Sequence, residues 1–144
     1  MSNAQQLVAA CAAMAVLVLL VGLRLIQNRV SEMKAKQIHP QATSNSIQIT
    51  SQLENVQAAD NYKNLFEAPI LFYALCAVAL ATNHTPNWLV WGVWAFVVLR
   101  YLHSFIQCTY NKVIHRLPVF LTSFFLITAL WIIFAIGFIQ ISQK

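Results

Sequence analysis

One segment near the C-terminus is far too apolar to lie in water: residues 117–139 have the sequence LPVFLTSFFLITALWIIFAIGFI. No side chain in this segment is charged. A helix needs about 20 mainly apolar residues to cross the hydrocarbon core of a bilayer. The segment therefore predicts a membrane-spanning helix.

Three earlier segments have the same character. In chain order they are LVAACAAMAVLVLLVGL (residues 7–23), LFEAPILFYALCAVALA (65–81) and WLVWGVWAFVVLRYLHSFI (88–106). Extended by the tolerant residues that flank them, the spans are predicted at about 5–26, 56–81, 87–108 and 117–140. We interpret residues 1–144 as a single domain, because the chain is short and no internal repeat is evident.

The overall composition agrees with a membrane protein. Hydrophobic residues make up 59% of the 144 residues and charged residues only 9%, whereas a soluble domain carries roughly 25% charged residues. A soluble or disordered chain is therefore excluded. The predicted fold class is an all-α integral membrane protein, a bundle of four transmembrane helices.

Charge and cysteine content exclude two further classes. The net charge is +5, but the basic residues flank apolar segments and form no basic run, so we predict no nucleic-acid partner. The chain has three cysteines, which is an odd number, and no two of them form a Cys-x-x-Cys pair; they are Cys11, Cys76 and Cys108. They predict neither a disulfide framework nor a metal site.

The distribution of basic residues predicts the orientation. Between the first and second apolar segments lie Arg24, Arg29, Lys34, Lys36 and Lys63, and before the fourth lie Lys112 and Arg116. Residues 82–87 contain no Lys or Arg. By the positive-inside rule the first and third loops face the cytoplasm and both termini face outward. Since no eukaryotic targeting signal is evident, we expect a bacterial inner membrane.

Polar residues gather near the predicted cytoplasmic end of the spans. The first set lies in the second span and would fall within an arc of about 100° on a regular helix: Asp60, Lys63, Asn64 and Glu67. The second set lies in the third span and would fall within about 80°: Arg100, His103, Gln107 and Tyr110. Arg24 ends the first span and Arg116 opens the fourth. Ionisable residues inside a membrane usually face a protein interior or a water-filled cavity. We therefore predict a polar site at this depth.

The residues allow structural and functional interpretations of this site. Glu67 and Arg100 could pair only to neutralise each other, and Lys112 and Arg116 could serve only as positive-inside anchors. The excess of positive charge otherwise suits an anionic ligand, because arginine binds carboxylates through two hydrogen bonds. A guanidinium beside a thiol favours the thiolate. Glutathione has the carboxylates, the amine and the thiol to fit, although charge alone does not single it out.

Two motifs resemble the MAPEG family, the membrane-associated proteins in eicosanoid and glutathione metabolism. Residues 64–69, Asn-Leu-Phe-Glu-Ala-Pro, are similar to the family's Asn-x-x-Glu motif with its downstream proline. Arg100 and His103 match its Arg-x-x-His motif, and Arg116 with Phe120 matches a later Arg-x-x-x-Phe pattern. The resemblance covers nearly the whole chain.

The resemblance implies a function and a site. It implies a homotrimer that binds glutathione as co-substrate between subunits near the cytoplasmic face, and a glutathione transferase or peroxidase acting on an apolar electrophile. Arg116 would be the catalytic residue that stabilises the thiolate; the binding residues would be Arg24, Lys63, Asn64, Glu67, Arg100, His103, Gln107 and Tyr110. Asp60, Lys63 and Gln107 depart from the family, which usually has a basic residue, arginine and tyrosine there.

Two other classes of function remain open from the sequence. A small multidrug-type transporter would suit four spans in a short chain, but it needs a carboxylate in the first span, and residues 7–23 contain none. A non-catalytic scaffold or lipid-binding bundle is the other alternative.

Overall fold

A computed structural model describes residues 1–43 and 45–142. The secondary structure of these described residues is helical throughout, in seven elements: α1 (Asn3–Ala35), η1 (Pro40–Thr43), α2 (Ser46–Gln52), α3 (Gln57–Asn64), α4 (Pro69–Ala81), α5 (Asn87–Cys108) and α6 (Val113–Ser142). Four stretches are long and apolar enough to cross a membrane: α1, α3 with α4, α5, and Val113–Gln140 of α6. The predicted fold class, a four-span all-α membrane bundle, is confirmed.

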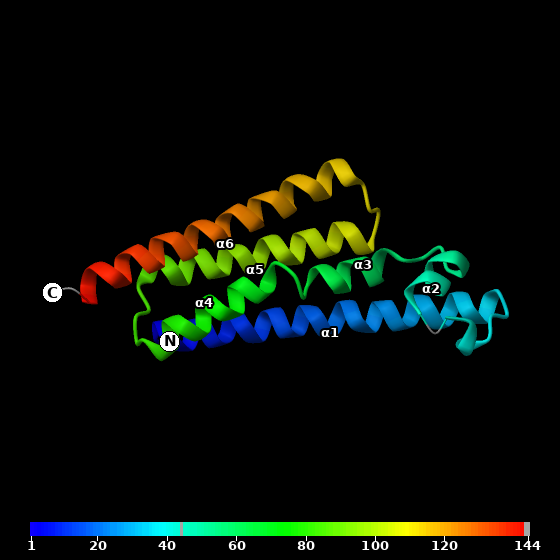
Figure 1. The fold of residues 1–144 in the computed structure, drawn as a ribbon, viewed down its shortest axis with the longest axis horizontal. Helices are drawn as coiled ribbons and strands as arrows, with labels where there is room; N and C mark the ends of the chain where they lie inside the picture. The colour runs from blue at the N-terminus through cyan, green and yellow to red at the C-terminus, as the bar shows by residue number, and fades with distance from the viewer. Residues whose placement is uncertain (44, 143–144) are drawn as a thin grey trace.

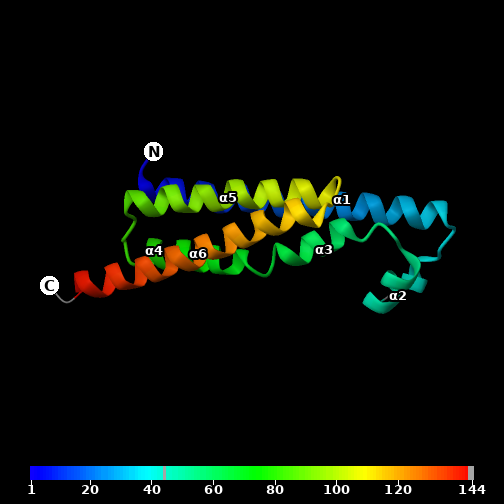
Figure 2. The same cartoon turned by 90° about the horizontal axis from the view of Figure 1, so that it is seen from above.

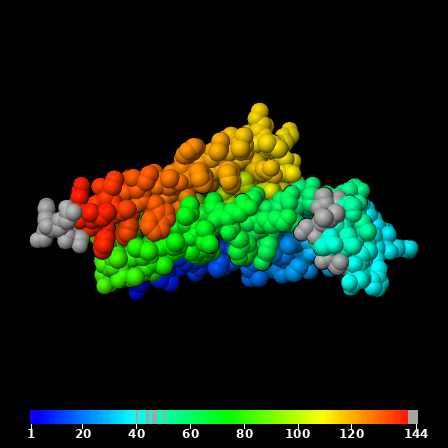
Figure 3. Space-filling model, viewed as in Figure 1, coloured from blue at the N-terminus to red at the C-terminus, as the bar shows by residue number. Residues whose placement is uncertain are grey.

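The helices form an elongated bundle with both termini at one end (Figures 1 and 2). At the opposite end, α1 continues past the other helices and carries η1 and α2 beside it (Figure 3). This second end holds Arg24, Lys36, Lys112 and Arg116, and we call it the basic end.

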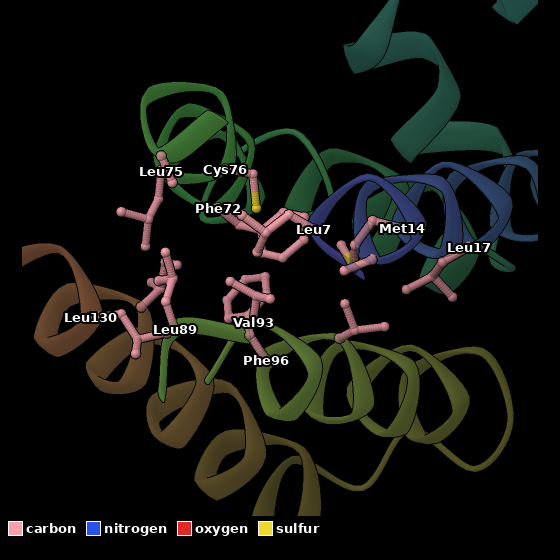
Figure 4. Packing of buried hydrophobic residues seen from close by; sticks show 14 of the residues in the cluster. Leu7, Met14, Leu17, Phe72, Leu75, Cys76, Leu89, Val93, Phe96 and Leu130 are labelled. Carbon is pink, nitrogen blue, oxygen red and sulfur yellow. The ribbon is translucent and has the colours of Figure 1, made fainter. Parts of the chain in front are cut away.

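The apolar core lies between α1, α4, α5 and α6 (Figure 4). Phe72 of α4 stacks on Phe96 of α5, with ring centroids 5.1 Å apart. Many large apolar side chains instead point outward, including Trp91, which is 77% exposed. Such exposure would be costly in water, but it suits a surface in contact with lipid.

The second span is interrupted, which corrects the expectation of a continuous helix over 56–81. Pro69 has no backbone N–H and its ring would collide with the carbonyl of Leu65, four residues earlier. The chain responds with tighter turns on both sides of the break, where Phe66 N–H donates to the Lys63 carbonyl at 2.9 Å and Ile70 N–H to the Glu67 carbonyl at 3.2 Å. The arc computed for Asp60 to Glu67 on a regular helix is therefore wrong.

The end of α5 corrects a second expectation. Thr109 Oγ1 donates to the Phe105 carbonyl at 2.6 Å, and Asn111 adopts a left-handed backbone with φ 47° while its N–H donates to the Ile106 carbonyl at 2.9 Å. A left-handed residue of this kind commonly ends a helix. Tyr110 consequently lies beyond α5 and does not share the helix face of Arg100 and His103.

An ionic cluster, the Glu32 clamp, fastens the segment before α3 to α1. The Glu32 carboxylate accepts hydrogen bonds from the backbone N–H groups of Glu54 (2.7 Å) and Asn55 (3.0 Å) and lies 2.8 Å from Lys36 Nζ. Glu32 follows the apolar part of α1, and these contacts, the Glu54 N–H foremost, lower its pKa to about 2. Lys36 also pairs with Glu54 at 2.8 Å. The clamp fixes where α3 begins.

Candidate functional site

Three polar side chains are buried along one face of α5. Arg100, His103 and Gln107 are 0%, 2% and 1% exposed, and their i, i+3, i+7 spacing places them on one side of the helix. Burying a charge or a polar group costs free energy unless it is hydrogen-bonded. The hydrogen-bond partners of these three side chains therefore show how the polar groups in this part of the bundle are stabilised.

Arg100 bonds to backbone and hydroxyl oxygens. Its Nη2 donates to the Asn64 carbonyl at 3.1 Å and its Nη1 to Ser123 Oγ at 3.5 Å, while its guanidinium carbon lies 5.7 Å from the centre of the Phe120 ring. The Asn64 carbonyl ends α3, where the helix dipole favours a positive charge. The carbonyl that Arg100 binds thus lies at the break before Pro69.

The ion pair between Glu67 and Arg100, one of the two interpretations that the sequence allowed, is not present in the described residues. Within the part of the chain that the structure describes, the ion pairs are those of Lys36 with Glu32 and Glu54. Glu67 is exposed and lies in the turn at 65–68 between α3 and α4. The two Nη atoms of Arg100 are hydrogen-bonded without it, while Nε is buried and has no hydrogen-bond partner among the described residues.

His103 and Asn64 are joined through Gln107. Asn64 Nδ2 donates to Gln107 Oε1 at 3.2 Å, and His103 Nε2 lies 2.9 Å from the same oxygen. An amide oxygen only accepts, so this contact fits the tautomer of His103 that carries its proton on Nε2. The other ring nitrogen, Nδ1, is buried and makes no hydrogen bond of ordinary geometry among the described residues.

Arg116 opens onto a pocket beside His103. The pocket has a volume of about 190 Å³, and its lining combines polar groups with an apolar wall: Asn64, His103, Val113, Arg116, Leu117 and Phe120. Arg116 is half-buried, and its Nη1 donates to Asn111 Oδ1 at 2.7 Å. We call this cavity the Arg116 pocket. It places a fixed guanidinium next to apolar surface at the basic end.

Other predicted site residues do not line this pocket within one chain. Lys63 and Glu67 are exposed, as is Asp60. Tyr110 is 49% exposed and its hydroxyl lies 3.3 Å from His115 Nδ1. Arg24 lines two other cavities, which it shares with Cys108 on a different face of α5.

The sequence analysis missed a second buried polar cluster. Asn61 is fully buried; its Nδ2 donates to Cys108 Sγ at 3.3 Å and its Oδ1 accepts from Ser104 Oγ at 3.3 Å. The sequence did carry a signal for this cluster, because Asn61 lies one helical turn before the predicted site residue Asn64 and Ser104 is next to the predicted site residue His103. Ser123, a partner of Arg100, gave no such signal, since serine is common in membrane helices.

The protein has four candidate membrane spans, a row of buried polar side chains on α5, and the Arg116 pocket beside them. These features define the class: a polytopic helical membrane protein with a polar site at one end. Within that class, the chain matches the model of the MAPEG family over residues 7–136, and it belongs to that family. Comparisons with curated proteins and with solved structures gave no match of comparable significance.

Proposed function

We propose that this protein is a membrane-bound glutathione-dependent transferase or peroxidase that acts on an apolar electrophile. The observation that carries the proposal is the Arg116 pocket, where a guanidinium fixed by Asn111 faces His103 and Asn64 at the basic end. Family membership supports the same reaction class.

The chemistry assigned to the pocket is stabilisation of a thiolate. Arg116 would lie against the sulfur of bound glutathione and favour its ionised form, which is the nucleophile. Leu117 and Phe120 would admit the apolar electrophile from the membrane side. With its proton on Nε2, the buried Nδ1 of His103 would receive a hydrogen bond from an N–H group of the peptide.

The glutathione site would be completed by a second subunit. Ligand sites usually have volumes of about 300–1,000 Å³, and the pocket in one chain has about 190 Å³. Lys63 and Glu67 are exposed beside it, and Arg24 lies on another side of α5. A neighbouring copy would bring its own Arg24 to this pocket, which supports a homotrimer over a monomer.

The proposed setting is a bacterial inner membrane with the basic end in the cytoplasm. Basic residues concentrate in cytoplasmic loops, and glutathione would reach the pocket from that side.

The direct test is the absorbance of the glutathione thiolate on addition of glutathione to the purified protein. A thiolate signal that saturates with glutathione is expected. Calorimetry separates this function from a non-catalytic bundle, which would give no heat of binding. The transporter alternative is disfavoured by the apolar part of α1, which has no carboxylate.

A further inference from the structure

Two cysteines that are far apart in the sequence meet inside the bundle. Cys11 belongs to α1 and Cys76 to α4, and their thiols are hydrogen-bonded to each other. Figure 4 shows the Cys76 sulfur pointing from α4 into the core. Both residues are free thiols. We call Cys11 and Cys76 the thiol pair.

The two members of the thiol pair differ in burial. Cys76 is 1% exposed and belongs to the apolar core together with Leu7 and Phe72. Cys11 is half-buried and packs against the edge of that core. A reagent dissolved in the lipid would therefore reach the Cys11 sulfur first, and the Cys76 sulfur lies behind it.

The thiol pair lies toward the end of the bundle that holds both termini (Figure 1). At a rise of about 1.5 Å per residue, Cys11 is about 12 Å from the start of α1 and Cys76 about 8 Å from the end of α4. In the orientation proposed above, this end faces the outside of a bacterial inner membrane. The compartment on that side is oxidising, and disulfides form and persist there.

We propose that the thiol pair is a modification site at which an apolar hydroperoxide from the membrane produces a disulfide between Cys11 and Cys76. A single buried cysteine usually acts only as a small hydrophobic residue, but a second thiol in contact allows oxidation to end in a cross-link. The disulfide would join the first span to the second span. This site goes beyond the proposed function and does not require glutathione.

The reaction has two steps. In the first, the Cys11 sulfur attacks an oxygen of the hydroperoxide, so that an S–O bond forms, the O–O bond breaks, and the thiol proton leaves with the alcohol product. In the second, the Cys76 sulfur attacks the sulfenic acid on Cys11, and the hydroxyl group leaves as water with the Cys76 proton. Two thiols are oxidised by two electrons, and one hydroperoxide is reduced to one alcohol and one water.

Oxidation of the full-length Cys108→Ser protein in detergent with cumene hydroperoxide tests the proposal. Cys108 is replaced because it is the third free thiol. After oxidation, unfolding and treatment with a maleimide, the protein should carry no label, and its mass should be lower than that of the reduced protein by two hydrogen atoms. The reduced protein should carry a label on both remaining cysteines. Digestion should release one cross-linked pair of peptides that contains residues 11 and 76.

Two variants in the same background test whether the contact between the thiols is responsible. Cys76→Ala removes the second thiol, so oxidation should stop at a sulfenic acid on Cys11 that dimedone traps. Cys11→Ala combined with Ala12→Cys turns the thiol by about 100° around α1, and the disulfide should then form roughly tenfold more slowly or not at all, because the Cβ vectors no longer converge.

Four results would overturn the assignment. They are two free thiols after oxidation, a sulfinic acid on Cys11 with Cys76 still free, a disulfide between two chains, and an equal rate of disulfide formation in the Ala12→Cys variant. Each of them would show that the two sulfurs do not react as a pair within one chain.

Thermal unfolding provides a second readout. The disulfide would close a long loop and restrict the unfolded chain, so oxidation should raise the midpoint of unfolding, dithiothreitol should reverse the shift, and Cys76→Ala should show none. Arg116→Ala should form the disulfide like wild type, even though it is expected to lose the glutathione thiolate signal. If the disulfide forms and no glutathione signal exists in wild type, only the proposed function fails.

Discussion

Arg100 is a fully buried charge whose hydrogen bonds run to a carbonyl and a hydroxyl. A guanidinium remains charged at any physiological pH, so these oxygens and the Phe120 ring compensate it. Glu67 makes no ion pair with Arg100 among the described residues, and the Arg116 guanidinium is held by Asn111. Arg100 is thus bonded to protein groups, whereas Arg116 is the arginine that lines the pocket.

Arg116→Ala should abolish the glutathione thiolate signal and weaken glutathione binding only modestly. Other basic residues would supply the carboxylate contacts, whereas the guanidinium near sulfur acts mainly on the ionised form. Loss of one preorganised partner of this kind costs about 10²–10³ in rate, measured as turnover with a model electrophile. Arg116→Lys should restore the signal partly, because lysine lacks the planar fork.

His103→Ala is the comparison variant for Arg116. It should weaken glutathione binding, seen by calorimetry, without removing the thiolate signal at saturation. Normal thiolate formation and turnover in Arg116→Ala would show that Arg116 is only a positive-inside anchor.

Glu32→Gln should loosen the segment before α3. A neutral amide accepts weaker hydrogen bonds than a carboxylate, so the backbone amides of residues 54 and 55 should exchange with deuterium roughly tenfold faster at neutral pH. Because the pKa of Glu32 is lowered to about 2, its contribution to stability is complete above its unfolded-state pKa and is lost progressively as the pH falls from there through about 2.

Glu54→Gln is the matched control for the Glu32 clamp. The Glu54 side chain is 85% exposed and contacts only Lys36 within the clamp, and exposed pairs contribute little. Exchange at residues 54 and 55 should therefore stay close to wild type. Equal acceleration in both variants would show that Glu32 has no special part in fixing the segment.

At the scale of elements, the break between α3 and α4 shapes the site. Helix α3 ends at Asn64 and α4 begins at Pro69, and the Asn64 carbonyl at the end of α3 is the partner of Arg100. The break therefore places a carbonyl oxygen of the second span against α5.

Gly92→Ala should destabilise the packing of α5 on α6. A Cβ at this position would lie 2.9 Å from Leu130 Cδ1 and 3.2 Å from its Cγ, and Leu130 is buried. Overpacking of this kind costs about 1–3 kcal/mol of the free energy of unfolding, seen as a lower midpoint of thermal unfolding in detergent. Adding Leu130→Ala should recover part of the loss.

Gly137→Ala is the control for Gly92, since nothing lies within 4 Å of a Cβ placed there. It should leave the midpoint unchanged or raise it slightly, because alanine favours helix over glycine. A lower midpoint in Gly137→Ala equal to that of Gly92→Ala would attribute the effect to helix propensity or lipid contact instead of packing.

At the scale of the whole molecule, the helix directions set the topology. Both termini lie at one end of the bundle, and the loops that follow α1 and α5 lie toward the other (Figure 1). Reporter fusions at Lys36 and Lys112 should report a cytoplasmic position, and a fusion at Asn83 an external one, following the distribution of basic residues. An external report at Lys112 would contradict this orientation.

The exposed ionisable residues of the second span predict self-association. Asp60, Lys63 and Glu67 are exposed in the single chain, and charged groups facing lipid are costly. Native mass spectrometry in a mild detergent should give about three times the 16.2 kDa mass of one chain. A monomer at every protein concentration would refute the prediction.

The sequence by itself determined the fold class and the family. Membrane spans are readable because about 20 apolar residues are needed wherever a helix crosses lipid, and all four expected spans are confirmed. The Asn64 to Pro69 and Arg100 to His103 motifs pointed to the family that the match establishes. These signals are local in the chain, so no knowledge of the packing was needed.

Only the tertiary structure decided which polar residues meet. A regular helix was assumed through Pro69 and past Cys108, and both assumptions failed, because a missing N–H broke one helix and a left-handed Asn111 ended the other. Arg100 therefore binds a carbonyl in place of Glu67, and Tyr110 lies outside the polar face. Asn61, Ser104 and Cys108 come together only when α3 packs on α5, since hydrogen bonds between distant segments depend on helix rotation and depth, which periodicity alone leaves undefined.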